Sequence, residues 1–128
     1  MKIKTSCRDV EAYITKDGSS IKELMHPLVH GNSAQSIAEA TVPAGASTLL
    51  HRHNVTEEIY HILSGCGLMT LGDESIFVEE GDSVCIHPGT FHNIKNIGEK
   101  ELRLLCCCSP AYSHEDTEIL GNKLINSL

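Results

Sequence analysis

Residues 45–65 read GASTLLHRHNVTEEIYHILSG, and this stretch decides the fold. His51 and His53 are separated by one residue, so on a strand both rings leave the same face, roughly 6.6 Å apart along the backbone. Glu58 follows five residues later, directly before the apolar run 59–63. An antiparallel partner strand would bring its carboxylate beside the two rings. The stretch therefore predicts two strands with metal-chelating side chains between them.

A second informative stretch, residues 81–96, reads GDSVCIHPGTFHNIKN. His92 enters an apolar segment directly after the turn-forming pair Pro88 and Gly89. A lone histidine in a strand is more often a packing or surface residue than a ligand. The joint spacing of three histidines and one glutamate favours ligation, with His92 as the fourth member.

The sequence from Ala34 onward predicts an all-β domain. Short apolar or alternating stretches are separated by glycine and other turn formers about every ten residues, which is typical of a sandwich or barrel. Eight short strands is the number found in a jelly roll. The expected strands are Gln35–Val42, Ser47–His53, Ile59–Leu63, Leu68–Leu71, Ser75–Val78, Ser83–Ile86, His92–Lys95 and Leu102–Cys108.

The two ends of the chain flank an expected barrel core at residues 34–110. Residues 1–33 are predicted to form edge strands or an arm of the same domain, around a turn at 16–20, that pairs with this barrel or with a neighbour's. In the C-terminal segment, residues 111–128, Ser113 is a candidate N-cap with acidic residues in the following turn. We expect a short helix there, ended by Gly121.

These two stretches resemble the motifs of the cupin superfamily. The first family motif, G-x5-H-x-H-x4-E-x6-G, matches Gly45, His51, His53, Glu58 and Gly65. The second, G-x5-P-x-G-x2-H-x3-N, matches Gly81, Gly89, His92 and Asn96. It departs from the family at one position, where His87 replaces proline and Pro88 follows. The resemblance implies a double-stranded β-helix, or jelly-roll barrel, in a small single-domain, RmlC-like cupin.

The resemblance further implies that His51, His53, Glu58 and His92 bind one divalent metal ion inside the barrel. Three imidazoles and one carboxylate suit iron, manganese, nickel, cobalt, copper or zinc better than calcium. An octahedral ion held by four protein atoms keeps two positions for water, a substrate or dioxygen, and can act as Lewis acid, template or redox centre.

The glutamate ligand has a neighbour that could replace it. The family also allows a shorter spacing before the acid, which would select Glu57. Only Glu58 leaves six residues before Gly65, so Glu58 is the predicted ligand.

Two further side chains are candidates for catalysis. Tyr60 shares the strand parity of Glu58, so its hydroxyl would face the pocket and can donate a hydrogen bond to a bound oxygen. His87 precedes Pro88, where it would serve as a proton carrier near the metal or simply occupy a turn. His61 has the opposite parity and is expected on the outer face.

Six cysteines raise the question of disulfide bonds or a second site. Cys106, Cys107 and Cys108 are consecutive on the last expected strand, where neighbours point to opposite faces and cannot easily bridge. We expect reduced thiols, with Cys106 and Cys108 packing as small hydrophobic groups on one face. The alternative is a second metal site or a redox switch.

Composition limits the partners. The chain has 128 residues and a formal net charge of -7, from 10 Lys and Arg against 17 Asp and Glu. This charge repels phosphate backbones and anionic headgroups, which argues against nucleic acid and membrane surfaces. No apolar run reaches about 20 residues, and the start lacks the apolar middle of a secretory signal, so a cytoplasmic protein is expected.

The function that the resemblance implies is a metal-dependent enzyme acting on a small polar metabolite of the carboxylate or carbohydrate type. Cupin enzymes include dioxygenases, decarboxylases, isomerases and lyases, and the fold does not choose among them. The alternatives are a non-catalytic, metal-dependent binding or sensing module and a metal-free binding shell. Other short single-barrel cupins also imply a homodimer.

Overall fold

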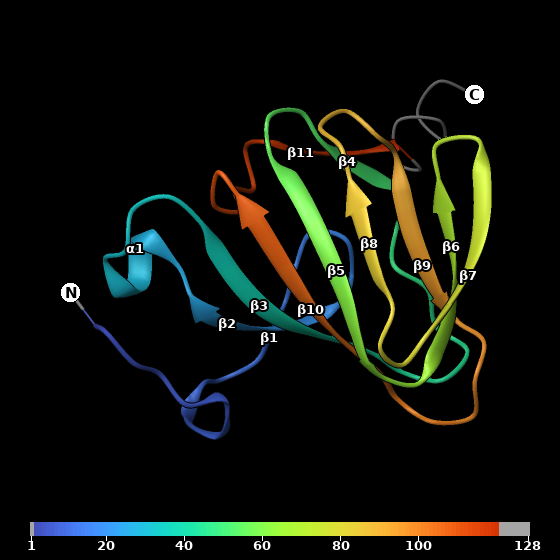
Figure 1. The fold of residues 1–128 in the computed structure, drawn as a ribbon, viewed down its shortest axis with the longest axis horizontal. Coiled ribbons are helices and arrows are strands. Elements are labelled where there is room, and N and C mark those ends of the chain that lie inside the picture. Colours follow the sequence, from blue (N-terminus) through green and yellow to red (C-terminus); the bar gives the residue numbers. More distant parts are fainter. Residues whose placement is uncertain (1, 121–128) are drawn as a thin grey trace.

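Two antiparallel β-sheets face each other in the computed structural model, which describes residues 2–120 (Figure 1). The strands are β1 (Tyr13–Ile14), β2 (Ser20–Met25), β3 (Ser36–Val42), β4 (His51–His53), β5 (Glu57–Ser64), β6 (Cys66–Leu71), β7 (Glu74–Glu79), β8 (Ser83–Ile86), β9 (His92–Asn96), β10 (Leu102–Ser109) and β11 (Thr117–Ile119). One sheet has the order β1-β2-β3-β10-β5-β8 and the other β11-β4-β9-β6-β7. Two short helical turns are η1 (Cys7–Asp9) and α1 (Pro27–His30). The predicted single-domain jelly roll is confirmed.

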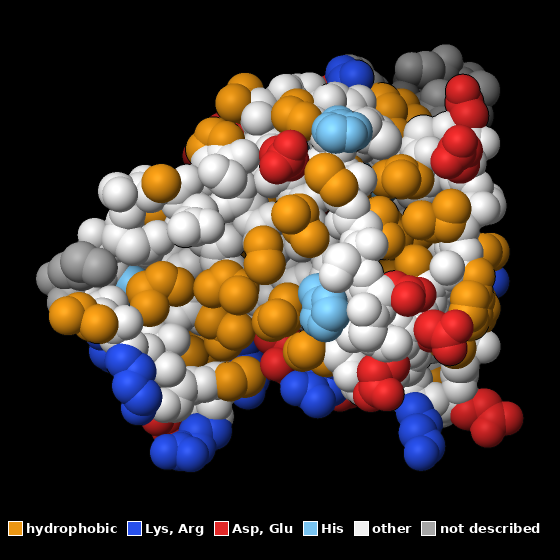
Figure 2. Space-filling model, in the orientation of Figure 1, with side chains coloured by type: hydrophobic (Ala, Val, Ile, Leu, Met, Phe, Trp, Pro, Cys, Tyr) orange, Lys and Arg blue, Asp and Glu red, His pale blue; other side chains and the backbone are white. Residues whose placement is uncertain are grey.

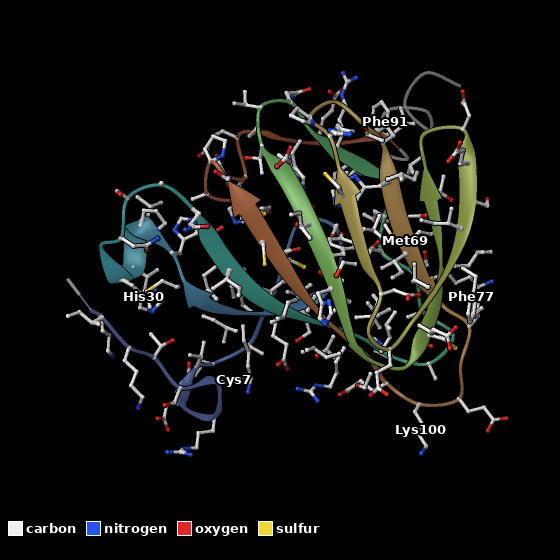
Figure 3. The ribbon with its side chains drawn as sticks, in the orientation of Figure 1. Cys7, His30, Met69, Phe77, Phe91 and Lys100 are labelled. Carbon is white, nitrogen blue, oxygen red and sulfur yellow. The ribbon has the colours of Figure 1, made fainter. Side chains whose placement is uncertain are left out.

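Alternation along the strands builds the core between the sheets. Every second residue of β3 and β10 is buried, as expected for strands whose successive side chains point to opposite faces. In Figure 3, Met69 of β6 points into the space between the sheets, whereas Phe77 of β7 points out of it. The largest fully buried apolar side chains are Ile62, Met69, Ile86, Ile94, Leu102, Leu104 and Val78.

Two motif glycines serve the turns that the sequence predicts. Gly65 lies between β5 and β6 with a φ of 89°, and a Cβ there would lie 3.1 Å from the Leu102 backbone. Gly89 follows β8 with a φ of 83°, and its N–H donates to the His53 carbonyl at 2.7 Å. Only glycine takes such angles without strain, so both positions fix how strands enter the site.

The stretch expected as one strand at Ser47–His53 is a strand only over its last three residues. Ser47 forms an isolated bridge with Lys95, and Thr48 donates its N–H to the Ile94 carbonyl at 3.0 Å. Leu49 instead donates to the Asp17 carbonyl, in the turn between β1 and β2. The amino-terminal turn therefore takes the hydrogen bond that would have continued the ladder.

The amino-terminal strands belong to this barrel. β1 pairs with β2, and β2 pairs with β3 along the edge of the six-stranded sheet. The turn between β1 and β2 is held by Asp17, whose Oδ1 accepts hydrogen bonds from Thr15 Oγ1, Ser19 N and Ser19 Oγ. The turn and the two strands beside it therefore lie at the edge of the chain's own six-stranded sheet.

The short helix expected from Ser113 is wrong, and Gly121 lies outside the described residues. Residues 117–119 form β11, which pairs with β4. The Asp116 carboxylate accepts hydrogen bonds from the backbone N–H groups of residues 54–56, between β4 and β5. Local capping signals favoured a helix, but pairing with β4 satisfies the backbone in an extended form.

All six cysteines are free thiols, as expected. Cys106 and Cys108 are both buried and Cys107 is half-buried on the opposite face, which confirms their predicted alternation. Within residues 2–120, no helix is long and apolar enough to cross a membrane.

Candidate metal centre

The three histidines and the glutamate meet between the two sheets. β4 carries His51 and His53 on its buried face, and His51 pairs directly with His92 of β9. Glu58 comes from the facing sheet, on the buried side of β5. One ligand atom from each of the four residues lies within 4.8 Å of the others, and none of the four is more than 5% exposed. The structure thus brings together all four predicted ligands.

The tautomers of two rings follow from their backbone contacts. His51 Nδ1 lies 2.7 Å from the Leu49 carbonyl oxygen, and His92 Nδ1 lies 2.9 Å from the Thr90 carbonyl oxygen. A carbonyl oxygen can only accept, so in both rings Nδ1 carries the proton when the imidazole is neutral. Each Nε2 then presents a lone pair.

The third ring is oriented by a threonine hydroxyl. Thr117 Oγ1 donates to the Ser113 carbonyl oxygen at 2.8 Å, which uses its only proton. It therefore accepts from His53 Nδ1 at 2.9 Å. His53 Nε2 is left with a lone pair 3.2 Å from Glu58 Oε1. All three rings thus have the orientation and tautomer that metal-ligating histidines take from such partners.

Burial and close contact shift the pKa values of two members of the site. Burial, together with the neighbouring His92, lowers the pKa of His51 to about 4, so the imidazole is neutral at pH 7. Burial alone would raise the pKa of the Glu58 carboxyl, but hydrogen bonds from His53 and His92, which require a proton on the Nε2 atom of the ring, hold it well below its usual range, and a cation in the place of that proton would act in the same direction. The site therefore combines a neutral imidazole at His51 with an ionised carboxylate at Glu58.

A divalent cation fits the centre. Glu58 Oε1 and His92 Nε2 are buried without a hydrogen-bond partner, although they lie 3.4 Å apart. Two lone pairs that face each other in a buried site need a proton or a metal ion between them. A transition-metal ion in the place of that proton suits this donor set of imidazole nitrogens and a carboxylate.

A narrow cavity of about 40 Å³ opens beside the centre. Its wall combines apolar residues of β3 and β10 with polar groups from the two ends of the described chain, including Asp17 and Tyr112. Asp17 Oδ2 lies 3.5 Å from His51 Nε2. None of the described residues that line the cavity is Lys or Arg.

The two catalytic candidates are in different places. Tyr60 is 3% exposed and lines the cavity, with its ring 5.9 Å from that of His92. His87 is exposed and does not line the cavity; it lies beside Glu57 on the outer surface. His61 also faces outward, where its Nδ1 contacts Ser83 Oγ at 2.8 Å.

Sequence reasoning missed three contributors to this centre. Cys108 was expected only to pack, but its thiol donates to Glu58 Oε2 at 3.3 Å. Asp17 and Thr117 lie outside the two motifs and reach the centre through the turn after β1 and through β11. The alternation that placed Cys108 on the buried face of β10 was the one usable signal, because β10 pairs with β5 opposite Glu58.

The chain resembles known proteins in sequence and in fold. An uncharacterized protein of Methanocaldococcus jannaschii is 56% identical over 118 residues, which cover 92% of this chain and 94% of that protein. The oxalate-binding protein of Thermotoga maritima is 34% identical over 84 residues, covering 66% of this chain and 65% of that protein.

Among solved structures, a predicted oxalate decarboxylase of Thermotoga maritima superimposes with a TM-score of 0.73 at 23% identity, covering 82% of this chain and 96% of that one. The formate complex of Lactobacillus farciminis oxalate decarboxylase gives 0.79 at 21% identity, covering 94% of this chain but 36% of that one. The family model described as Cupin domain matches residues 38–108. With the fold, both motifs and more than half of its length in agreement, the chain belongs to the cupin family.

Proposed function

We propose that the chain is a metal-dependent enzyme acting on a small carboxylate, with His51, His53, Glu58 and His92 holding one divalent transition-metal ion. The observation that carries the proposal is that the Nε2 atoms of three histidine rings meet around the Glu58 carboxylate. Two of the atoms that face each other there, Glu58 Oε1 and His92 Nε2, are buried and have no hydrogen-bond partner. Such an ion, when bound, supplies Lewis-acid or redox chemistry to a ligand that completes its coordination.

The size and the charge of the cavity favour a small anionic ligand that binds only when the metal ion is present. Carboxylates of Asp17, Glu23 and Glu58 line the cavity, and no lysine or arginine does among the described residues. An anionic substrate would be repelled by these carboxylates unless a bound cation compensates its charge. A volume of about 40 Å³ also favours a ligand of a few non-hydrogen atoms over a carbohydrate.

Two side chains are placed to position such a ligand. Burial raises the pKa of Tyr60 well above its ordinary value, so its hydroxyl stays protonated and can donate a hydrogen bond to a substrate oxygen. Asp17 is held by its turn, and its Oδ2 can accept a hydrogen bond from a substrate hydroxyl or a water. His87 has no part in this proposal because it lies outside the cavity.

Oxalate is the first ligand to test, because the Thermotoga maritima relative at 34% identity is named an oxalate-binding protein. The experiment compares chelator-treated protein with protein reloaded with Mn²⁺, Fe²⁺ or Zn²⁺, and measures oxalate binding by calorimetry and oxalate conversion by ¹³C NMR. We expect metal-dependent binding and turnover, both lost in Glu58→Gln and turnover reduced in Tyr60→Phe. Equal oxalate binding with and without metal would contradict the proposal.

A second candidate is a metal-dependent binding or sensing protein. The name of the same relative supports it, since that name states binding and no reaction. Metal-dependent oxalate binding without conversion by any of the three metals would favour this candidate over the enzyme. The homodimer implied by other short cupins stays a prediction, which light scattering on the full chain would check.

A further inference from the structure

A second group of metal-ligating side chains lies outside the barrel, on the outer face of the six-stranded sheet. It consists of Glu57 at the start of β5, Cys85 in β8 and His87 directly after β8. One ligand atom of each residue lies within 4.8 Å of the others, and all three side chains are exposed. Neither the two motifs nor the proposed function uses these residues in this role.

Strand register explains why the three side chains meet. β5 and β8 are antiparallel, with Glu58 opposite Ile86 and Ile59 opposite Cys85. One further step of this register places Glu57 opposite His87. Because successive side chains alternate, Glu57, Cys85 and His87 share the outer face, while Glu58 and Ile86 are buried on the inner one.

The backbone around this group is well anchored. The N–H of Thr90 donates to the His87 carbonyl at 3.2 Å, closing the turn after β8, and Gly89 is bonded to β4 through His53. Figure 2 shows this face of the molecule, where a histidine and an acidic side chain lie near each other over the adjoining ends of β5 and β8. Ligands on paired strands lose little backbone freedom on binding an ion.

We propose that Glu57, Cys85 and His87 form a second metal site, which takes Zn²⁺ or another thiophilic divalent ion. A thiolate, an imidazole and a carboxylate are three of the ligand types that zinc prefers, and three protein ligands leave a fourth tetrahedral position open. The thiolate distinguishes this donor set from that of the barrel, whose four members are imidazoles and a carboxylate.

The second site is physically separate from the barrel centre. Glu57 and Glu58 are consecutive on β5, so their carboxylates leave opposite faces of the sheet. An ion at each would lie on the two sides of one strand, with no ligand in common. Each site can therefore be removed by substitution without removing a ligand of the other.

Cobalt titration of the chelator-treated full chain tests the proposal, because only a thiolate ligand gives Co²⁺ an intense near-ultraviolet charge-transfer band. We expect the band to be complete at about one equivalent in Glu58→Gln, which lacks a barrel ligand, and at about two equivalents in the wild type, where the barrel centre takes up Co²⁺ without a thiolate ligand. It should be lost in Cys85→Ser and strongly weakened in His87→Gln. Cys107→Ser is the matched control: this thiol lies on the same outer face, with Ile59 between it and Cys85, and its removal should leave the band unchanged.

Three results would overturn the proposal. The first is the absence of the band in a wild-type protein whose circular dichroism shows the folded chain. The second is a band that survives in Cys85→Ser, which would move thiolate ligation to another cysteine such as Cys108. The third is a band that is complete at half an equivalent in Glu58→Gln and is accompanied by dimer formation in light scattering, which would mean that two chains share one ion.

Discussion

Replacing Thr117 with valine removes one hydroxyl that never touches the proposed metal. Thr117 is 4% exposed, and its Oγ1 holds His53 Nδ1 at 2.9 Å while donating to Ser113. Without that acceptor, the ring is free to carry its proton on Nε2, which would then donate to Glu58 Oε1 at 3.2 Å. The metal would have to displace this proton, so the variant should bind metal more weakly.

The expected size of the effect follows from the loss of one orienting hydrogen bond. Removal of such partners costs about 10–100-fold in metal affinity, or about 1.4–2.7 kcal/mol. The free energy of unfolding of the metal-free protein should fall by less than this. The lost hydrogen bond is worth roughly 1 kcal/mol, and the new contact between His53 and Glu58 offsets part of it. Competition with a chromophoric chelator measures the affinity, and urea unfolding measures the stability.

Thr117→Ser is the matched control because it keeps the hydroxyl and removes only a methyl group. We expect its metal affinity to stay within about threefold of the wild type, since the orienting bond that sets the larger loss is retained. Wild-type metal affinity in Thr117→Val would refute the assignment of the His53 tautomer. Equal weakening in both variants would refute it as well, because packing would then be the cause.

The remaining predictions concern the metal, a close contact and a loop. In protein that carries Cys85→Ser and so lacks the outer site, metal at 100 times the dissociation constant of the barrel centre should raise the free energy of unfolding by about 2.7 kcal/mol, seen as a higher melting temperature that is absent when His51→Ala is added; an equal rise in that variant would refute the role of His51. In Gly67→Ala the new Cβ would lie 3.0 Å from Ile94, so urea unfolding should show a loss of about 1–3 kcal/mol, and a loss under 0.5 kcal/mol would contradict this packing. Asp116→Asn should cost about 0.5–1.5 kcal/mol, because its amide N–H₂ would face backbone donors of residues 54–56; unchanged stability would refute that role.

Sequence predicted most of the fold because the informative signals are local. Alternating burial and turn-forming glycines placed the eight central strands, with every end but the start of β4 within two residues of the prediction. The two failures arose where distant segments compete for the backbone. Residues 47–50 are tied to the turn at Asp17 and to β9, and residues 117–119 pair with β4 rather than forming a helix. Neither partner is visible in a local pattern.

The same distinction applies to the site. Parity and motif spacing were enough to group His51, His53, Glu58 and His92, because all four lie on strands whose faces alternate regularly. Parity also placed Tyr60 in the cavity wall. His87 lies one residue beyond β8, and the alternation of that strand carries it to the outer face rather than toward the metal centre.

The residues that orient the histidine rings of the centre could not be predicted from the sequence. Thr117 acts on His53 through the pairing of β11 with β4, across a separation of 64 residues. Asp17 reaches His51 from the turn between β1 and β2. Such contacts depend on tertiary pairing, which intervals along a single chain do not encode.

The central claim is that this chain holds one transition-metal ion between His51, His53, Glu58 and His92. Elemental analysis of tag-free protein, purified without chelator beside Glu58→Gln, tests it most directly. An ion bound at the outer site would add to the measured metal content per chain, so both proteins should carry Cys85→Ser. The account predicts near one metal ion per chain, lost in the added Glu58→Gln variant. Full occupancy in both proteins, or none in either after metals are added back to folded protein, would contradict it.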